Sequence, residues 1–94
     1  MTESAAPRAL SGELTFDTVP AVWRDLAAWL NAGGGEVAVD LAQVAHADSA
    51  GLALLIELQR LARSKQRKLR LVGVPEQLAD LIRINGLTEA FALK

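Results

Sequence analysis

Two kinds of hydrophobic pattern alternate along this chain at close spacing. One is the short apolar or alternating run of a β-strand, and the other is the repeat of about 3.6 residues of an amphipathic helix. The strand-like segments are residues 9–14, 36–41, 68–72 and 90–93, and the helix-like segments are residues 19–31, 49–64 and 75–85. Strands and helices in alternation, joined by short connections, predict an α/β domain with a largely parallel sheet and right-handed crossovers.

Size and composition confine the chain to one small globular domain. Its 94 residues suffice for a single core, and the 51% of hydrophobic residues excludes a disordered chain. A net charge of −1 creates no global attraction to nucleic acid, and the lack of cysteine excludes disulfides and thiolate metal sites. Charges interrupt every apolar stretch, and residues 1–8 lack the apolar segment of a secretory signal, so we expect a cytoplasmic protein.

The helix predicted over residues 49–64 has two unlike faces. At 100° per residue, one face gathers the leucines that belong in the core. The opposite face combines a hydroxyl, a small residue, an apolar residue and charges, which are Ser49, Ala53, Ile56, Glu57 and Arg60. Two interpretations stay open, because either this face receives a partner or Ile56 is half-buried under a loop. Ile84, a second apolar residue out of place on the next helix, favours a partner.

The residues before this helix carry no recognisable catalytic or metal site. Asp48 or Ser49 can accept a hydrogen bond from the first-turn amides, so the plain interpretation is a helix N-cap. His46 is the sole histidine, and zinc needs cysteines or clustered carboxylates beside it. Ser49, His46 and Asp48 lie too close along the chain to align as nucleophile, base and orienting group. We therefore expect no catalysis, no metal and no other cofactor.

A basic stretch follows the same helix. Six lysines and arginines lie between Arg60 and Arg70 without an acid among them, which is the strongest charge asymmetry of the chain. One interpretation is a solvated turn whose cations oppose the helix dipole favourably. The other is docking on an acidic partner or on acidic lipid headgroups. We do not expect nucleic acid here, because aromatic stacking residues are missing nearby.

Three segments of the sequence share the landmarks of one family. They are Ser11-Gly12-Glu13-Leu14, Val39-Asp40-Leu41 and Asp48-Ser49-Ala50-Gly51-Leu52-Ala53-Leu54-Leu55. In this order they resemble the STAS domain, the fold of sulphate transporters and anti-sigma-factor antagonists. The resemblance implies a mostly parallel or mixed sheet of four to five strands with about three helices. It covers residues 9–94, preceded by a flexible segment or short strand at residues 1–8.

Within this family, the chain looks most like the small STAS subunit of the Mla phospholipid ABC transporter. That resemblance implies a non-catalytic cytoplasmic subunit, peripheral to the inner membrane, which binds and supports the transporter's ATPase in maintaining lipid asymmetry. No nucleic acid and no small-molecule substrate is implied. The family's partner-contacting hydroxyl falls on Ser49, its preceding acid on Asp48 and its small glycine on Gly51. The candidate partner-binding residues are Asp48, Ser49, Ala50, Gly51, Ala53, Ile56, Glu57, Arg60 and Ile84.

The hydroxyl position leaves a second function open. The lipid-transport branch often has threonine there, whereas the phosphorylated antagonists carry serine, as this chain does at Ser49. The alternative is therefore an anti-sigma-factor antagonist regulated by phosphorylation of Ser49. A phosphate would add about −1.5 to −2 charges at the helix N-terminus, favoured by the dipole and opposed by Asp48. No final helix of the kind found in antagonists is predicted, which favours the transporter branch.

Overall fold

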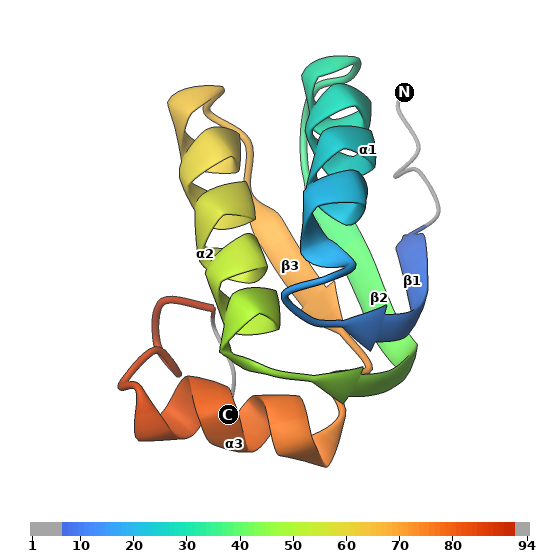
Figure 1. Ribbon diagram of the computed structural model, residues 1–94. Helices are drawn as coiled ribbons and strands as arrows, with labels where there is room; N and C mark the ends of the chain where they lie inside the picture. Colours follow the sequence, from blue (N-terminus) through green and yellow to red (C-terminus); the bar gives the residue numbers. More distant parts are fainter. Residues whose placement is uncertain (1–6, 92–94) are drawn as a thin grey trace.

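Strands and helices alternate along residues 7–91, the part of the chain that the computed structural model describes (Figure 1). The elements are β1 (Arg8–Leu14), α1 (Val19–Asn31), β2 (Val37–Ala47), α2 (Ser49–Ser64), β3 (Leu69–Val72) and α3 (Glu76–Ile84). The predicted α/β class with about three helices is confirmed. The bounds of α1 and α2 agree with the predicted ones, because the apolar positions that mark these helices do face the core.

All three strands are parallel, and β2 lies between β1 and β3. The chain thus moves across the sheet in one direction. Because crossovers between parallel strands are right-handed, α1 and α2 must cover the same face of the sheet. Figure 1 shows these two helices side by side over that face, with α3 lying across one end of the sheet. The parallel sheet is confirmed, but within residues 7–91 it has three strands, where four to five were expected.

The expected strands at the two ends of the chain account for this difference. At residues 90–93, Ala90 and Phe91 lie in a turn, and residues 92–94 are outside the described part. Phe91 is buried, so its apolar character serves the core and not strand pairing. The segment expected at residues 1–8 falls mostly on residues 1–6, also outside the described part, and Arg8 already belongs to β1.

The central strand continues to Ala47, beyond the predicted end at residue 41. Its later buried residues, Leu41, Val44 and Ala47, are spaced three apart instead of two. The pairing of β2 with β1 shifts register in two places, and such bulges break the alternation that identifies a strand in sequence. The extension places Ala47 opposite Leu14 and so brings the start of α2 beside the end of β1.

The core fills the space between the sheet and the helices. Among the described residues no polar or charged residue is buried. Fully buried side chains come from every layer and include Leu14, Leu26, Leu30, Val37, Val39, Leu41, Leu55, Leu58, Leu78 and Ile82. The core face predicted for residues 49–64 is confirmed for Leu54, Leu55, Leu58 and Ala62, whereas Leu61 is half-buried. The opposite face of α2 is therefore free to form a surface.

Candidate functional site

Asp48 fixes the start of α2 through three hydrogen bonds. One carboxylate oxygen, Oδ1, accepts a hydrogen bond from the amide of Ala50 at 2.8 Å, as an N-cap does, and Oδ2 accepts one from the amide of Phe16 at 3.4 Å. The amide of Asp48 donates to the carbonyl of Leu14 at 3.2 Å. The half-buried Asp48 therefore ties together the end of β1, the loop before α1 and the first turn of α2.

Gly51 lets α2 approach β1 closely. A Cβ atom at this position would lie 2.6 Å from the carbonyl oxygen of Leu14 and 3.2 Å from the Cβ of Ala47. A separation of 2.6 Å from a backbone atom is too short for a real side chain, so only glycine fits without a shift. Gly51 is buried. Gly51 is among the candidate partner-binding residues, and in this structure it acts on the first turn of α2 through packing.

The exposed face of α2, which we call the α2 face, consists of Ser49, Ala53, Ile56, Glu57 and Arg60. All are exposed except Ile56, which is half-buried and packs against the core. Glu57 and Arg60 form an ion pair of 3.0 Å, one helical turn apart. Among the other candidates, Ala50 is half-buried on α2, and Ile84 is 75% exposed on α3. The structure therefore brings five of the predicted residues onto one helix face.

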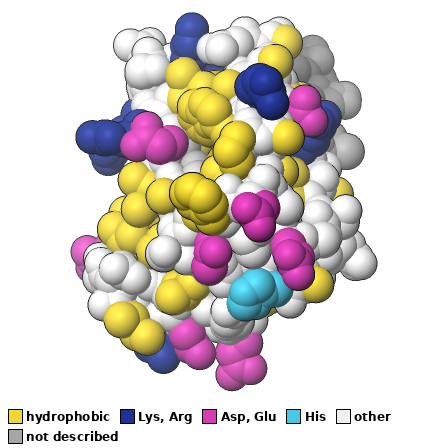
Figure 2. All heavy atoms as spheres, viewed as in Figure 1, with side chains coloured by type: hydrophobic (Ala, Val, Ile, Leu, Met, Phe, Trp, Pro, Cys, Tyr) yellow, Lys and Arg dark blue, Asp and Glu magenta, His cyan; other side chains and the backbone are white. Residues whose placement is uncertain are grey.

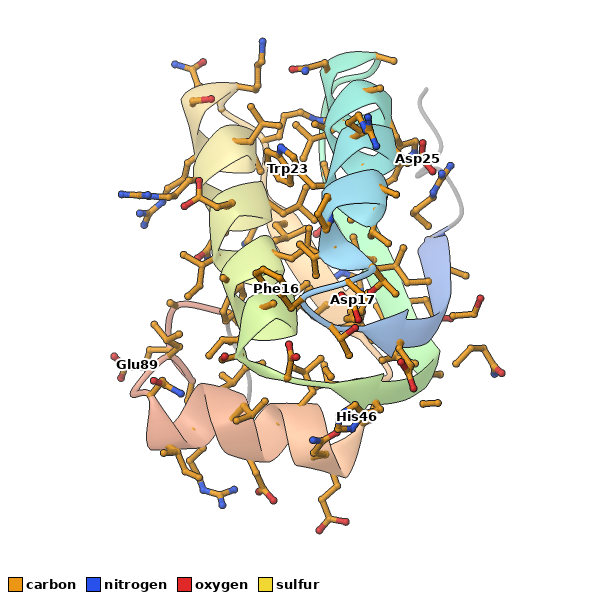
Figure 3. All side chains as sticks on the ribbon, viewed as in Figure 1. Phe16, Asp17, Trp23, Asp25, His46 and Glu89 are labelled. Atoms are coloured by element: carbon orange, nitrogen blue, oxygen red, sulfur yellow. The ribbon has the colours of Figure 1, made fainter. Side chains whose placement is uncertain are left out.

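Phe16 is a surface residue that the sequence analysis missed. It lies between β1 and α1, and its side chain is 80% exposed. Figure 3 shows Phe16 in front of the first turns of α2, with Asp17 beside it and Trp23 farther along between α1 and α2. The only local signal was an isolated aromatic residue between polar neighbours, Thr15 and Asp17. Such a pattern does not distinguish an exposed phenylalanine from a buried one.

A groove runs between α1 and α2 next to this phenylalanine. Its volume is about 270 Å³, and its lining is mostly apolar: Val19, Trp23, Ala50, Ala53, Leu54 and Glu57. Two alanines on α2 leave the space, and the half-buried ring of Trp23 forms part of the opposite wall. We call this hollow the α1–α2 groove. It borders the α2 face, so that the apolar surface continues across both helices.

Gln77 on α3 holds the end of β2, a second contact that the sequence did not reveal. Its side-chain amide accepts a hydrogen bond from the amide of Ala47 at 3.2 Å and donates one to the carbonyl of the same residue at 2.9 Å. The residue that follows Ala47 is the N-cap of α2. The start of α2 and the first turn of α3 are therefore fixed to one point of the backbone.

The basic stretch from Arg60 to Arg70 is partly used inside the chain. The guanidinium of Arg67 donates to the carbonyls of Gly35 at 3.0 Å and Gly34 at 3.1 Å, and to that of Leu30. It thereby holds the loop that follows α1. Arg70 pairs with Glu36 at 3.6 Å. Sequence reasoning missed the role of Arg67, because its partners lie more than thirty residues away.

The structure gives the surroundings of His46 for residues 7–91. Within residues 7–91, no hydrogen bond joins His46 to Ser49 or Asp48, and no three histidine or acidic side chains cluster as a metal site would require. His46 lies opposite Glu13 in the sheet and is exposed. The same part of the chain holds no helix with both the length and the apolar character needed to cross a bilayer.

The fold and its exposed helix face define the class of this domain. The structure superposes on a sulfate transporter family protein from Wolinella succinogenes with a TM-score of 0.70, at 22% identity over 88% of this chain and 67% of that one. This likeness concerns the fold. The arrangement is that of the STAS domains, α/β units with helices packed on a parallel sheet.

The family follows from the sequence comparisons. A family model described as "Mlab, STAS domain" matches residues 2–93, so the chain belongs to this family of STAS domains. The intermembrane phospholipid transport system binding protein MlaB of Escherichia coli is 34% identical over 79 residues, 84% of this chain and 78% of that protein. The anti-sigma-B factor antagonist of Staphylococcus epidermidis is 32% identical over 80 residues, 85% of this chain and 74% of that protein. Relatives of both names thus lie at similar identity.

Proposed function

We propose that this protein is a non-catalytic STAS subunit that binds the ATPase of a phospholipid-transporting ABC transporter and supports its activity. The match to the MlaB family model over residues 2–93 favours this branch. The observation that carries the proposal is the α2 face. It joins small and apolar side chains at the start of α2 to a polar rim made by the Glu57–Arg60 pair.

The α2 face is already ordered in the free chain, which favours binding of a protein partner. Ser49 and Ala53 are small, so another chain can approach the backbone of α2 closely. The cap made by Asp48 and the tight packing of Gly51 fix the position of this first turn. A rigid surface loses less conformational entropy on binding than a mobile one. We therefore place the contact with the ATPase at the α2 face, extended by Ile84 on α3.

The proposed location follows from the proposed partner. The chain would be cytoplasmic and held at the inner membrane through the ATPase, where the complex maintains lipid asymmetry. No direct contact of this chain with lipid is needed for that role, and no small-molecule substrate is proposed.

Purification from the native cell tests the proposal. We expect the tagged full-length chain to bring down the ATPase of a phospholipid ABC transporter, identified by mass spectrometry. Ser49→Arg should abolish this recovery, because a long cation then occupies the centre of the contact. Ala28→Arg is the matched control, since Ala28 is exposed on α1 and is not part of the α2 face. Recovery without any transporter subunit, or full recovery with Ser49→Arg, contradicts the proposal.

A second candidate function is an anti-sigma-factor antagonist switched by phosphorylation of Ser49. Ser49 is the exposed first residue of α2, and the antagonist of Staphylococcus epidermidis is as similar to this chain as the transport proteins are. A phosphate there would interact favourably with the first-turn amides and repel the carboxylate of Asp48. Incubation with the cognate kinase and ATP, followed by intact mass, decides the matter. An unchanged mass removes this alternative.

A further inference from the structure

The α1–α2 groove has the dimensions of a site for a side chain. A volume of about 270 Å³ has room for one large side chain but not for a whole helix, which is about 10–12 Å wide. The lining is apolar apart from Glu57. α1 and α2 are packed on the core through Leu26, Leu30 and Leu58, which are fully buried, so the walls of the groove are fixed.

Phe16, which Figure 3 shows in front of the first turns of α2, is an exposed apolar group on an ordered loop. The hydroxyl of Thr18 accepts a hydrogen bond from the amide of Thr15 at 2.9 Å and donates one to the carbonyl of Glu13 at 2.7 Å. The amide of Phe16 itself is bonded to Asp48. These bonds order the backbone of the loop that carries the exposed phenyl ring. Phenylalanine is enriched at protein interfaces relative to the rest of the surface, so an exposed phenylalanine on an ordered loop suits a contact with a partner.

The charges along the border of the apolar surface are negative near the histidine, and basic side chains lie beside other parts of the strip (Figure 2). Figure 2 shows hydrophobic side chains in a strip over α1 and α2, with acidic side chains gathered below and beside it around the histidine. Asp17 is exposed, and neither Asp17 nor Asp48 has an ion-pair partner within residues 7–91. A partner segment that covers the strip gains attraction if it carries cations next to its apolar residue.

We propose that the α1–α2 groove receives one large apolar side chain of the partner protein. Phe16 packs against the same partner segment, and lysine or arginine residues on that segment face Asp17 and Asp48. The inference rests on the proposed function, for which it specifies the chemistry of the partner's contact segment. That segment presents a leucine or an aromatic residue flanked by positive charges.

The same charges disfavour the other occupants. In a symmetric dimer of this chain, each copy would present the same patch, so the acidic border would face itself. An anionic lipid surface would meet Asp17 and Asp48 with like charge. A segment of another protein with an apolar side chain and basic neighbours can fill the groove and also pair with the acidic residues at its border.

A peptide experiment tests the groove without the transporter. The probes are a twelve-residue peptide of leucine and arginine and a twin in which every arginine is glutamate, added to the ¹⁵N-labelled full chain. We expect the arginine peptide to shift the indole N–H resonance of Trp23 and the amides of Ala50 and Ala53, and the glutamate twin to shift none. Ala53→Arg should lower the affinity for the arginine peptide at least about tenfold, and Ala28→Arg should leave that affinity unchanged.

Several outcomes overturn the inference. Equal shifts with both peptides, no shift with either, or unchanged binding to Ala53→Arg exclude a groove selective for a cationic apolar segment. Shifts of the same resonances with protein concentration alone assign the groove to a second copy. Shifts produced by phosphatidylglycerol vesicles and not by the peptides assign it to a lipid surface.

The ATPase provides the second arm and separates this inference from the proposed function. If the ATPase binds the unchanged chain and Ala53→Arg equally well, the inference about the groove is wrong, and so is the placement of the contact at Ala53 on the α2 face, whereas the proposal that this chain binds the ATPase stands. If the ATPase does not bind the unchanged chain, the proposed function is wrong, and the peptides still decide the groove. We expect binding to the unchanged chain and to Ala28→Arg, with at least about a tenfold loss for Ala53→Arg.

Discussion

The two ends of α2 carry surfaces of opposite charge. The side chains at the two ends also differ in whether they find partners within the chain. At the N-terminal end, Phe16 and Asp17 face solvent beside a groove that no described residue fills. At the C-terminal end, the basic stretch is partly bound within the chain. Arg67 bonds three carbonyls and Arg70 pairs with Glu36. Part of the conspicuous basic stretch thus stabilises the fold, whereas the inconspicuous Phe16 and Asp17 are exposed at the proposed contact.

The comparison teaches that a charge run indicates a binding site only after its internal partners have been counted. Arg60 also has a partner, the exposed Glu57. The remaining cations, Arg63, Lys65 and Lys68, are exposed near the end of a helix, where they interact favourably with its dipole. The interpretation as a solvated, dipole-matched turn therefore suits these three residues, and Arg67 has a structural role that neither interpretation foresaw.

The largest expected effect is a loss of stability caused by a substitution at the N-terminal end of α2. Gly51→Ala forces a methyl group against the carbonyl of Leu14, so α2 must move away from β1. We expect the free energy of unfolding to fall by about 2–3 kcal/mol. Urea denaturation measures this. Gly34→Ala is the control, because a Cβ there meets nothing within 4 Å, and its effect should stay within about 0.5 kcal/mol. Equal effects of the two variants would show that the tight contact at Gly51 does not matter.

The second expected effect tests whether Arg67, near the C-terminal end of α2, stabilises the fold. Arg67→Ala removes the guanidinium that holds the loop after α1, and we expect a loss of about 2 kcal/mol in the free energy of unfolding. Arg67→Lys keeps the charge but not the planar fork, so it should recover only part of that loss. Lys65→Ala, at an exposed cation, should change the stability by less than about 0.5 kcal/mol. Full recovery by lysine would mean that charge alone matters.

The smallest expected effect concerns binding at the C-terminal end. Replacing Arg63, Lys65 and Lys68 together by glutamine should leave the affinity for the ATPase within about twofold, because these residues follow Arg60, the last residue of the α2 face, and are not part of the proposed contact. Isothermal titration calorimetry of the purified proteins measures this. A larger loss, approaching that of Ser49→Arg, would move the contact to the basic end and erase the contrast between the two ends.

The helices were predictable from the sequence, and the strands only in part. α1 and α2 have long amphipathic patterns, and Asp48 marks the start of α2 by the usual capping chemistry. The end of β2 could not be predicted from alternating apolar residues, because bulges space its later buried residues three apart. At the N-cap of α1, Thr18 makes no side-chain capping bond, since its hydroxyl is used to order the preceding loop.

The candidate site was predictable where it depends on one helix. The positions of Ser49, Ala53 and Glu57 on one exposed face follow from helical geometry alone. The contributions of Phe16 and Trp23 depend on how α1 packs beside α2, and no local pattern encodes that distance. The packing role of Gly51 could not be predicted for the same reason. Its closest neighbour, Leu14, is remote in sequence and adjacent only in the fold.

The amide of Gln77 has a consequence for self-association. β3 pairs with β2 only as far as Asp40, so the rest of β2 has no strand on that side within residues 7–91. Unpaired backbone edges recruit strands from other molecules and start aggregates. By bonding both the N–H and the carbonyl of Ala47, Gln77 takes the place of the missing strand at this residue. One side chain thus seals the end of an open edge and occupies backbone groups with which a strand of another molecule could pair.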